Sequence, residues 1–443
     1  MNTNVLRAKP LTLWVGLVED AKASESVFIR VARRSGSSCV VLIHPWFKCL
    51  GMLRVMVLCL TSVSAQAAEP IPSNETQTSF VPVFVGGQEG YACYRIPAMV
   101  TTKHGALLAM ADGRISGCSD IPNPLDLVLK RSLDSGRTWT PLQVIADYGK
   151  NTNDTDVYPA SGLTNPVSRV AAGDAALLLD RTNGRVWVIY DNGASIRGKR
   201  HNRAIKLELR YSDDDGLTWS QAIDVESQNP GLRPAGTDFM ASPGNGIQLA
   251  SGPHAGRLIF PAYVWAEPYY STVIYSDDHG QSWHRGGNAA AGGGEIQVAE
   301  TLDGRLLATI RNNTFPEKGV RFFNTSVDGG ETWGTPYYQK PNQPPLPDPK
   351  CQSSILRFLF TKGTNALILA NAADAASRTK MTLRISYDEG RTWPVSNLVY
   401  AGGSAYSALT TLPSGEVGML FEMDGYKRIS FVRRSIGEIV GKR

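Results

Sequence analysis

The chain consists largely of short apolar runs rich in Val, Ile, Leu and Tyr, separated by turn residues, with no long amphipathic stretch between them. Runs of this length and composition are typical of β-strands joined by tight turns. The clearest predicted strands are 185–190, 205–212, 257–265, 271–276, 305–310, 381–387 and 428–434. The pattern therefore predicts an all-β protein and excludes a helical bundle, a coiled coil and a polytopic membrane protein.

One octapeptide pattern, Ser-x-Asp-x-Gly-x-Thr/Ser-Trp, recurs along the chain, and we call its copies the Asp boxes. The copies are 132–139, 212–219, 276–283, 326–333 and 386–393. Asp followed two residues later by Gly suits a hairpin turn, because the carboxylate accepts from turn N–H groups and Gly adopts a positive φ. Intervals of 50 to 80 residues between the Asp positions leave room for one four-stranded blade each time. The boxes therefore predict radially repeated antiparallel sheets, a β-propeller, and we interpret their carboxylates as structural.

The propeller is expected to occupy residues 68–443 as one domain. The Pro-rich segment 341–350 is expected to cross between blades rather than to divide domains. The preceding segment 52–67 has one Arg near its start, a short apolar run and a small-residue triplet, which is the layout of a secretory signal peptide. We therefore expect cleavage after Ala67 and a secreted or periplasmic protein; an uncleaved interfacial anchor is the alternative. Residues 1–51 show no domain-like periodicity, and we interpret them as an over-extended reading frame that is not expected to fold.

The composition is that of a globular protein with a sizeable core, since 42% of the 443 residues are hydrophobic and 9% aromatic. A formal net charge of +5 would normally raise the question of nucleic acid or acidic membranes as partners. The excess of basic over acidic residues lies in residues 1–67, however, because the rest of the chain holds 37 basic and 37 acidic residues. We therefore expect no nucleic-acid partner and no stable membrane insertion.

Three cysteines lie beyond the predicted signal peptide: Cys93, Cys118 and Cys351. Cys93 lies two residues before Arg95 and Cys118 two before Asp120, so strand alternation would send each thiol to the side of its polar neighbour. If these polar side chains share a pocket, a Cys93–Cys118 disulfide is geometrically reasonable in an oxidising compartment; two buried reduced thiols are the alternative. The cysteines lack metal-ligand spacing with the few histidines, so no metal is expected. The sequence also shows no P-loop and no nucleotide-binding fingerprint, so no cofactor is expected.

Three arginines occupy positions where a purely structural role is awkward, although any one of them alone is more often a surface residue. Arg95 stands inside the apolar stretch 91–99, Arg311 ends the apolar run 306–310, and Arg378 directly precedes a predicted strand. A buried Arg needs an anionic partner. Three guanidinium groups that converge at one end of a propeller would form a planar-donor cradle for a carboxylate.

The Tyr-Arg-Ile-Pro motif around Arg95, the five Asp boxes and the order of the later polar residues resemble the Asp-box, or BNR-repeat, sialidase (neuraminidase) superfamily. The resemblance extends from about Tyr91 to the C-terminus and is closest to the bacterial exo-α-sialidases. It implies a six-bladed propeller of four-stranded antiparallel blades. It also implies that Arg95, Arg311 and Arg378 hold the carboxylate of sialic acid, with Arg384 as the competitor for the third place.

The same resemblance implies the remaining site residues. Asp120 would be the acid/base, Tyr406 the nucleophile and Glu295 its partner, while Arg114 would contact the substrate. Two further acids would also bind the substrate: Glu422 by orienting the first triad Arg, and Asp174 by contacting the sugar on a looser alignment. The acidic rivals are Glu300 and Asp112, of which the former is interpreted as structural and the latter as part of the turn sequence. The stretch 148–169 is long for this superfamily, so its pocket residues do not carry over.

These residue types suit the implied chemistry. The anomeric carbon of sialic acid carries its own carboxylate, which would repel an attacking Asp or Glu, whereas a neutral phenol avoids that repulsion. Glu295 would take the proton of Tyr406, and the positive field of the arginines is expected to help the phenol ionise. Asp120 would protonate the leaving oxygen and then activate water, which gives net retention.

The resemblance therefore implies a secreted retaining exo-α-sialidase, a glycoside hydrolase that removes terminal sialic acid from glycoproteins, glycolipids and oligosaccharides and acts as a monomer. One alternative is a non-catalytic Asp-box propeller that binds glycans or protein partners. The other is a trans-sialidase, or a hydrolase of a related nonulosonic acid.

Overall fold

The structure is a computed structural model that describes residues 27–32, 38–43 and 80–441, except 121–123, 148–170, 195–203, 235–236, 266–268, 339–343 and 360–364. The chain separates into two compact units, Met1–Gln77 and Thr78–Arg443. In the first unit, β1 (Val27–Ala32) and β2 (Ser38–Ile43) form an antiparallel pair. The predicted signal segment 52–67 and the long stretch 148–169 lie outside the described residues.

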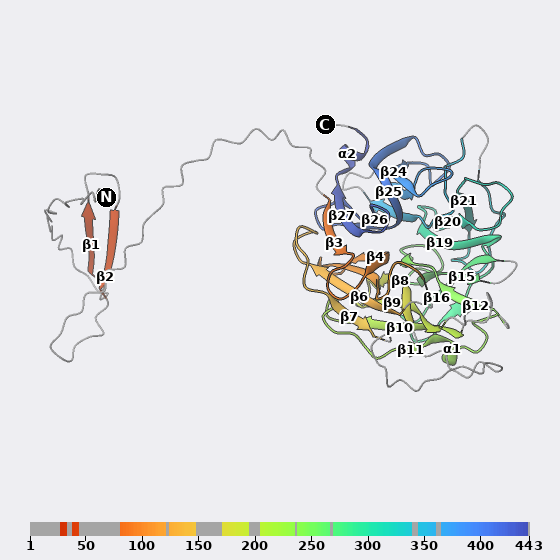
Figure 1. Cartoon of the computed structure of the whole chain (residues 1–443), viewed down its shortest axis with the longest axis horizontal. Coiled ribbons are helices and arrows are strands. Elements are labelled where there is room, and N and C mark those ends of the chain that lie inside the picture. Colours follow the sequence, from red (N-terminus) through yellow and green to blue (C-terminus); the bar gives the residue numbers. More distant parts are fainter. Residues whose placement is uncertain are drawn as a thin grey trace. The chain divides into compact units, whose positions relative to one another are not determined.

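The second unit contains nearly all of the described strands, arranged as a succession of small sheets (Figure 1). One sheet has four antiparallel strands in chain order: β4 (Cys93–Thr101), β5 (Leu107–Arg114), β6 (Leu125–Ser132) and β7 (Gln143–Ala146). The next has the order β11-β10-β9-β8-β13: β8 (Ala171–Leu179), β9 (Val186–Ala194), β10 (Ala204–Ser212), β11 (Ile223–Asp224) and β13 (Gly244–Asn245). A one-turn helix, α1 (Val225–Gln228), follows β11 and is capped by the Asp224 carboxylate.

Two further sheets continue the succession. The six-stranded one contains β12 (Asp238–Ala241), β14 (Ile247–Gln248), β15 (Leu258–Trp265), β16 (Tyr270–Ser276), β17 (His284–Arg285) and β18 (Ala290–Ala291). The three-stranded one contains β19 (Gly293–Glu300), β20 (Leu306–Asn312) and β21 (Phe322–Ser326). The described part of the Pro-rich segment lies between β21 and the following sheet, where Pro347 forms an isolated bridge with Val320.

The last sheet has seven strands and closes the unit. Its strands are β22 (Ser354–Leu359), β23 (Asn365–Ala372), β24 (Thr379–Ser386), β25 (Val395–Thr411), β26 (Val417–Met423), β27 (Arg428–Arg434) and, at its edge, β3 (Val81–Val85). Because β3 begins the unit and pairs antiparallel with β27 near its end, the two ends of the unit are joined by backbone hydrogen bonds (Figure 1). The short helix α2 (Ile436–Ile439) follows, with a capping box formed by Ser435 and Glu438.

Most of the large buried clusters lie between successive sheets, and one lies within the seven-stranded sheet. One buried cluster joins Leu107 of β5 to Leu420 of β26 and Phe431 of β27. Another joins Leu108 of β5 to Val188 of β9. Further clusters connect each sheet to the next in the same way. Face-to-face packing of neighbouring sheets in chain order is the arrangement of a propeller.

The Asp boxes form tight turns that also pack against the neighbouring sheet. In the first box, Asp134 accepts hydrogen bonds from the backbone N–H and the hydroxyl of Thr138. Gly136 has φ +82°, and a Cβ there would lie 2.1 Å from Phe431 of β27. The turn therefore requires glycine both for its backbone conformation and for its close approach to the sheet that closes the unit. The other four boxes repeat the carboxylate contacts to the residue four positions on, which supports a structural role for all five.

The predictions of an all-β protein and of a propeller-like arrangement of small antiparallel sheets are confirmed. Uniform blades of four strands are not observed, because the described sheets of the larger unit contain four, five, six, three and seven strands. Two-residue strands such as β13 and β14 are added to the sheets by short pairings with β8 and β15. The 17-residue β25 pairs first with β24 and then with β26, so that two groups of strands form one sheet. Strand pairing alone does not define the number of blades, so the number six stays a prediction.

Candidate active site

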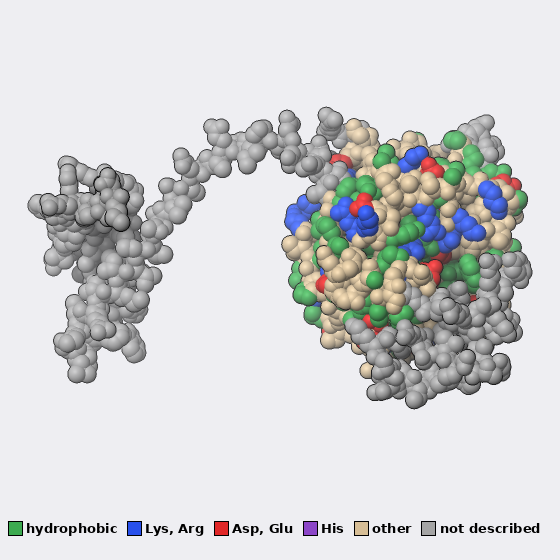
Figure 2. Space-filling model, in the orientation of Figure 1, with side chains coloured by type: hydrophobic (Ala, Val, Ile, Leu, Met, Phe, Trp, Pro, Cys, Tyr) green, Lys and Arg blue, Asp and Glu red, His purple; other side chains and the backbone are tan. Residues whose placement is uncertain are grey.

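One pocket collects polar side chains from strands of all five sheets of the larger unit. Its principal lining residues are Arg95, Asp112, Arg114, Asp120, Asp174, Asp191, Met240, Tyr263, Trp265, Glu295, Arg311, Arg378 and Tyr406. Most of the predicted site residues are therefore neighbours in space, although they are scattered along the sequence. On the outer surface, basic side chains occupy several places on the face in view, with acidic and apolar side chains between them (Figure 2).

Arg95 is directed into the pocket by an irregularity in β4. The register of β4 against β5 shifts between Arg95 and Ala98, and Ile96 has φ +60°, an unusual conformation for a β-branched residue. Glu422 of β26 stabilises this geometry: it accepts from Nε of Arg95 at 3.0 Å and from the backbone N–H of Ile96 at 2.9 Å. The same carboxylate also accepts from the backbone N–H of Tyr406. Glu422 thus lies behind the pocket and orients Arg95, as the resemblance implied, rather than lining the pocket itself.

Arg311 and Arg378 approach Tyr406 from other elements. Nη1 of Arg311, in β20, lies 2.7 Å from Oη of Tyr406 and 2.7 Å from Oε2 of Glu295. Arg378 directly precedes β24, and its guanidinium carbon lies 5.5 Å from the ring centroid of Tyr406, compared with 5.3 Å for that of Arg95. The three guanidinium groups therefore surround one phenol ring and share one pocket, which is the juxtaposition that a carboxylate cradle requires.

Arg384, the competitor for the third place, takes no part in this cluster. It lies in β24 and donates to the hydroxyl of Ser396 on the neighbouring β25. It is absent from the described lining of the pocket.

Tyr406 and Glu295 form the centre of the site. The hydroxyl of Tyr406 donates to Oε1 of Glu295, and both side chains are buried. Burial raises the pKa of Tyr406 well above its ordinary value, while the positive charge of Arg311 opposes that rise. The expected help from the arginines is present, but burial outweighs it. The phenol therefore rests in its neutral form, with an acceptor for its proton already in place.

Asp120 is held at the rim by Arg114. Nη1 of Arg114 donates to Oδ1 of Asp120 at 2.7 Å, and Nη1 of Arg95 lies 3.8 Å from the same oxygen. The side chain of Asp120 is 75% exposed, whereas that of Arg114 is 1% exposed. An exposed carboxyl group on a buried cation can exchange protons with solvent while its position is kept, which suits a general acid and base. The buried Arg114 acts here through Asp120 and lines the pocket beneath it.

Asp112 was interpreted from the sequence as a turn residue, and that interpretation is wrong. It lies in β5 opposite Arg95 and accepts from Nη2 of Arg114 at 3.0 Å. Its other oxygen accepts from the backbone N–H of Asp174, at 3.1 Å. Burial raises the pKa of Asp112 to about 6. The Asp-Gly-Arg sequence resembles a turn, but here it continues a strand because its side chains have partners inside the pocket.

Asp174, in β8, also lines the pocket and has φ +54°. Burial raises its pKa well above the ordinary value, and the nearby Asp112 adds to that rise. Glu300, by contrast, accepts from the backbone N–H groups of Ala250 and Ser251. That contact fits the structural role expected for it.

Sequence reasoning missed several pocket residues. Tyr263 and Trp265 of β15, Met240 of β12 and Asp191 of β9 all line the pocket. The ring of Tyr426 stacks on Arg95 at 4.2 Å, and its hydroxyl accepts from Arg378. The residues of β15 lie in an apolar run that is equally consistent with core packing, so the sequence offered no signal for them.

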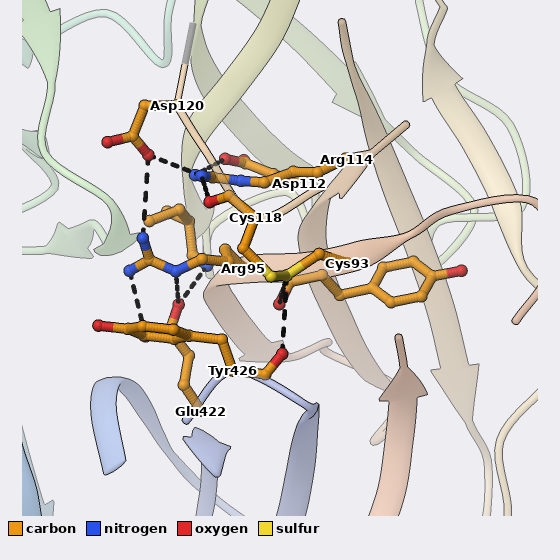
Figure 3. Close-up of a disulfide and its surroundings, with 10 residues drawn as sticks. Cys93, Arg95, Asp112, Arg114, Cys118, Asp120, Glu422 and Tyr426 are labelled. Carbon is orange, nitrogen blue, oxygen red and sulfur yellow. Dashed lines mark hydrogen bonds and ion pairs between the residues drawn. A yellow bond between two sulfur atoms is a disulfide. The ribbon is translucent and has the colours of Figure 1, made fainter. Parts of the chain in front are cut away.

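Cys93 and Cys118 form a disulfide, which resolves the open alternative in favour of the oxidised pair (Figure 3). Cys351 is a buried free thiol that packs with Ile96, Ala405 and Tyr406 beneath the pocket, and burial raises its pKa to about 12. Among the described residues, no group of three or more His, Cys, Asp or Glu side chains could hold a metal ion. In the same residues, no helix is both long and apolar enough to cross a membrane.

The fold agrees with comparisons to known proteins. The family described as "BNR repeat-like domain" matches residues 105–419, so the chain belongs to that family. Two similar proteins are named sialidases. The sialidase of Micromonospora viridifaciens is 35% identical over 377 residues, which are 81% of this chain and 54% of that protein. The sialidase of Bacteroides fragilis strain YCH46 is 29% identical over 354 residues, or 76% of this chain and 61% of that protein. The chain thus spans between one half and two thirds of these relatives.

Solved structures show the same resemblance. The Hadza microbial sialidase Hz136 superposes with a TM-score of 0.69 at 27% identity, covering 94% of this chain and 75% of that one. The leech intramolecular trans-sialidase, solved with 2,7-anhydro-Neu5Ac, superposes with a TM-score of 0.67 at 20% identity, covering 83% and 72%. The second similarity shows a shared fold alone. The superfamily resemblance deduced from the Tyr-Arg-Ile-Pro motif and the Asp boxes is confirmed.

Proposed function

We propose that this protein is a retaining exo-α-sialidase, which hydrolyses terminal sialic acid from glycoconjugates through a tyrosyl-enzyme intermediate. The observation that carries the proposal is the placement of the Tyr406 hydroxyl between the Glu295 carboxylate and the Arg311 guanidinium. The named activities of the similar proteins support it. The substrates would be sialylated glycoproteins, glycolipids or oligosaccharides, bound by a monomer.

Binding would begin with the carboxylate of the sugar, which the guanidinium groups of Arg95, Arg311 and Arg378 would hold by charge-assisted hydrogen bonds. The anomeric carbon bears that carboxylate, so the bound sugar would present this carbon to the Tyr406 ring that the arginines surround. Asp174, which also lines the pocket, would contact the sugar.

In the first step, Oη of Tyr406 would attack the anomeric carbon while Glu295 accepts the phenolic proton. Asp120 would protonate the glycosidic oxygen, so that the bond to the leaving sugar breaks and an alcohol departs. In the second step, the Asp120 carboxylate would deprotonate a water molecule, which displaces the Tyr406 oxygen from the anomeric carbon. The phenol would recover its proton from Glu295, and two inversions give net retention.

Burial raises the pKa of the Tyr406 phenol, so the neutral phenol of the resting enzyme is a poor nucleophile for the first step. In the second step the same phenol is a good leaving group only when its proton is returned. Glu295 serves both needs, because one carboxylate within hydrogen-bonding reach can take and return the same proton. The arginines would stabilise the phenolate character that develops in both transition states.

We further propose six blades, in which the two halves of β25 belong to successive blades. The support is that β25 pairs with β24 up to Gly403 and with β26 from Ser404 onward. We also propose export directed by residues 52–67. A disulfide between Cys93 and Cys118 supports an oxidising compartment, since such bonds are rare in the cytosol.

The test is incubation of the purified full chain with sialyllactose, followed in real time by proton NMR. The proposal predicts free sialic acid that appears first as the α anomer and then mutarotates. Release of the β anomer first would overturn the retaining mechanism. An anhydro product or transfer to added lactose would replace hydrolysis with a trans-sialidase reaction, and no cleavage at all would favour a non-catalytic propeller.

A further inference from the structure

We propose that two buried side chains, Gln352 and Ser242, are positioning residues for the nucleophile and its proton acceptor. They hold the backbone directly after Tyr406 and the backbone directly after Glu295 to one shared segment of the chain. The proposal rests on the function proposed above, in which the Tyr406 hydroxyl attacks the sugar and Glu295 takes its proton. Neither positioning residue belongs to the described lining of the pocket, and neither takes part in the chemical steps.

Tyr406 and Glu295 both lie where a strand departs from regular pairing. The register of β25 against β26 shifts directly before Ser407, and that of β19 against β20 shifts directly before Ile296. Tyr406 and Glu295 are the residues that immediately precede these two positions. An irregularity of this kind turns a side chain in a new direction, but it also interrupts the ladder of backbone hydrogen bonds. The positions of both groups therefore depend on contacts other than strand pairing.

The backbone next to Tyr406 is held by the side chain of Gln352. Oε1 of Gln352 accepts from the backbone N–H of Ser407 at 3.0 Å, and Nε2 donates to the backbone carbonyl of Ser407 at 3.0 Å. A neighbouring antiparallel strand would supply the same two bonds, one in each direction. Because β24 pairs with β25 only up to Gly403, the Gln352 amide takes the place of a strand neighbour at Ser407.

The backbone next to Glu295 is held in the same manner by a hydroxyl group. Oγ of Ser242 accepts from the backbone N–H of Ile296 at 2.8 Å and donates to its carbonyl at 2.7 Å. Within the described sheets, β19 is an edge strand that pairs only with β20. Ser242 thus binds the open edge of β19 one residue after Glu295.

One short segment connects the two contacts. Ser242 is followed by Pro243, whose carbonyl accepts from Nε2 of Gln352 at 3.2 Å and from Nε2 of Gln297, in β19, at 3.0 Å. The next residue, Gly244, has φ +124°, and a Cβ there would lie 3.0 Å from Oε1 of Gln297 and 3.1 Å from Nε2 of Gln352. The two amides therefore pack directly against this backbone, which requires glycine at the point of contact. The segment ties β19 and β25 together beneath the pocket.

Loss of this connection should affect the nucleophile more than the binding of the sugar carboxylate. A displacement of about 1 Å at a reacting group can lower a rate by about 10²-fold. The arginines have supports of their own, since Arg95 donates to Glu422 and Arg378 donates to the carbonyl of Lys350 and the hydroxyl of Tyr426. We therefore expect slower attack at nearly unchanged anion binding.

The first experiment compares the loss of two buried amides in the full chain. Gln352→Met keeps the length of the side chain but removes its donors and its strong acceptor. Gln248→Met is the matched control, because Gln248 is likewise buried and donates to Asp180 and Thr182. Gln248 is absent from the described lining of the pocket. All proteins are assayed at a temperature well below their melting temperatures.

The substrate is 4-nitrophenyl α-sialoside, whose leaving group hardly needs an acid, so kcat/KM reports mainly the attack by Tyr406. For Gln352→Met we expect kcat/KM to fall by about 10- to 100-fold. The inhibition constant of a carboxylate-bearing sialic acid analogue should stay within about threefold of the wild-type value. Gln248→Met should leave both quantities within about threefold, even where it lowers the melting temperature as much.

Ser242→Ala provides a second route if Gln352→Met does not fold. It removes one hydroxyl group and should give the same split between kcat/KM and the inhibition constant, because a displaced Glu295 accepts the phenolic proton less well. Ser212→Ala is the matched control, since Ser212 is a buried hydroxyl that accepts from the backbone N–H of Gly216 in the second Asp box. This control should retain wild-type kinetics.

Three results would overturn the proposal while the wild-type activity upholds the proposed function. They are an unchanged kcat/KM in the folded variants, an equal weakening of the analogue, and an equal loss of kcat/KM in the matched controls. A wild-type protein that cleaves no sialoside would instead overturn the proposed function and, with it, the roles assigned to Gln352 and Ser242.

Discussion

The hydroxyl of Tyr406 donates a hydrogen bond to the carboxylate of Glu295, a residue 111 positions earlier in the chain. The two side chains come from β25 and β19, which belong to different sheets. A buried phenol bonded to a buried carboxylate that is itself paired with an arginine is an uncommon arrangement for structural purposes alone, because burying charge is costly. The Tyr406–Glu295 pair is therefore the main support for the interpretation of this pocket as an active site.

Removal of the Tyr406 hydroxyl should abolish turnover without unfolding the protein. We expect Tyr406→Phe to lower kcat by about 10³-fold or more, because the remaining residues offer no replacement nucleophile of equal position. Tyr387→Phe is the matched control, since that ring is 44% exposed and lies in an Asp box. Kinetics on a fluorogenic α-sialoside, with circular dichroism of each variant, provide the measurement; a Tyr406→Phe protein as active as the control would remove the nucleophile assignment.

Arg311 should contribute to the binding of an anionic ligand as well as to the stabilisation of the Tyr406 phenolate. Arg311→Ala is expected to weaken the binding of a carboxylate-bearing transition-state analogue by about 2–4 kcal/mol, which raises the dissociation constant by roughly 30- to 1000-fold. Arg384→Ala serves as the control, because Arg384 donates to Ser396 rather than lining the pocket. Isothermal titration calorimetry measures both. Equal affinities for the two variants would contradict the carboxylate cradle.

Glu422 should matter for stability and for binding. Its carboxylate accepts from Nε and Nη2 of Arg95 and from the backbone N–H groups of Ile96 and Tyr406. Glu422→Ala would leave these donors buried without an acceptor, and we expect a loss of about 3–5 kcal/mol in the free energy of unfolding. Glu422→Gln keeps one acceptor oxygen and should lose less. Denaturant unfolding tests this order, and an alanine variant as stable as the glutamine variant would show that the contacts contribute little.

Asp112 should impose a characteristic pH dependence on stability. Burial raises its pKa to about 6. Between about pH 4 and 6 the folded protein would therefore hold a proton that the unfolded chain has released, so this contribution to stability is complete below pH 4 and is lost as the pH rises through 6. In this pH range the free energy of unfolding therefore falls as the pH rises. We expect Asp112→Asn to reduce this slope by the amount that corresponds to about one bound proton.

The control for this slope is Asp303→Asn. The hydrogen bond from Arg305 lowers the pKa of Asp303 to about 2, so the stabilisation from that group is lost only as the pH falls below about 4. Unfolding free energies at several pH values from 4 to 7 give the slope for each variant. A wild-type slope that survives Asp112→Asn would assign the titration to another group.

Much of the fold could be predicted from local patterns. The predicted strand 428–434 coincides with β27 (Arg428–Arg434), and the predicted strand 205–212 differs from β10 by one residue. Five similar turns with the same Ser, Asp, Gly and Trp positions are a strong local signal. The extra strand β13 and the unbroken β25 were not predictable, because short edge pairings depend on neighbours that are distant in sequence.

The site was predicted less evenly. Charged residues inside apolar strands, such as Arg95, draw attention because they need partners. Tyr263 carries no such signal, since an apolar strand residue that lines a pocket and one that packs in a core have the same local pattern. Asp112 was misassigned because a local Asp-Gly pair favours a turn, while its contacts to Arg114 and Asp174 favour the strand.

The central claim, that Tyr406 becomes covalently attached to the sugar, can be tested by trapping the intermediate. A 2,3-difluoro sialic acid has a good leaving group at the anomeric carbon and a neighbouring fluorine that slows the second step, so the glycosyl-enzyme should accumulate. Peptide mass spectrometry of the full chain after this treatment is the most direct measurement. We predict one added sugar on the peptide that contains Tyr406. A label on Glu295 or Asp120, or no label on an enzyme that still turns over sialosides, would contradict the account.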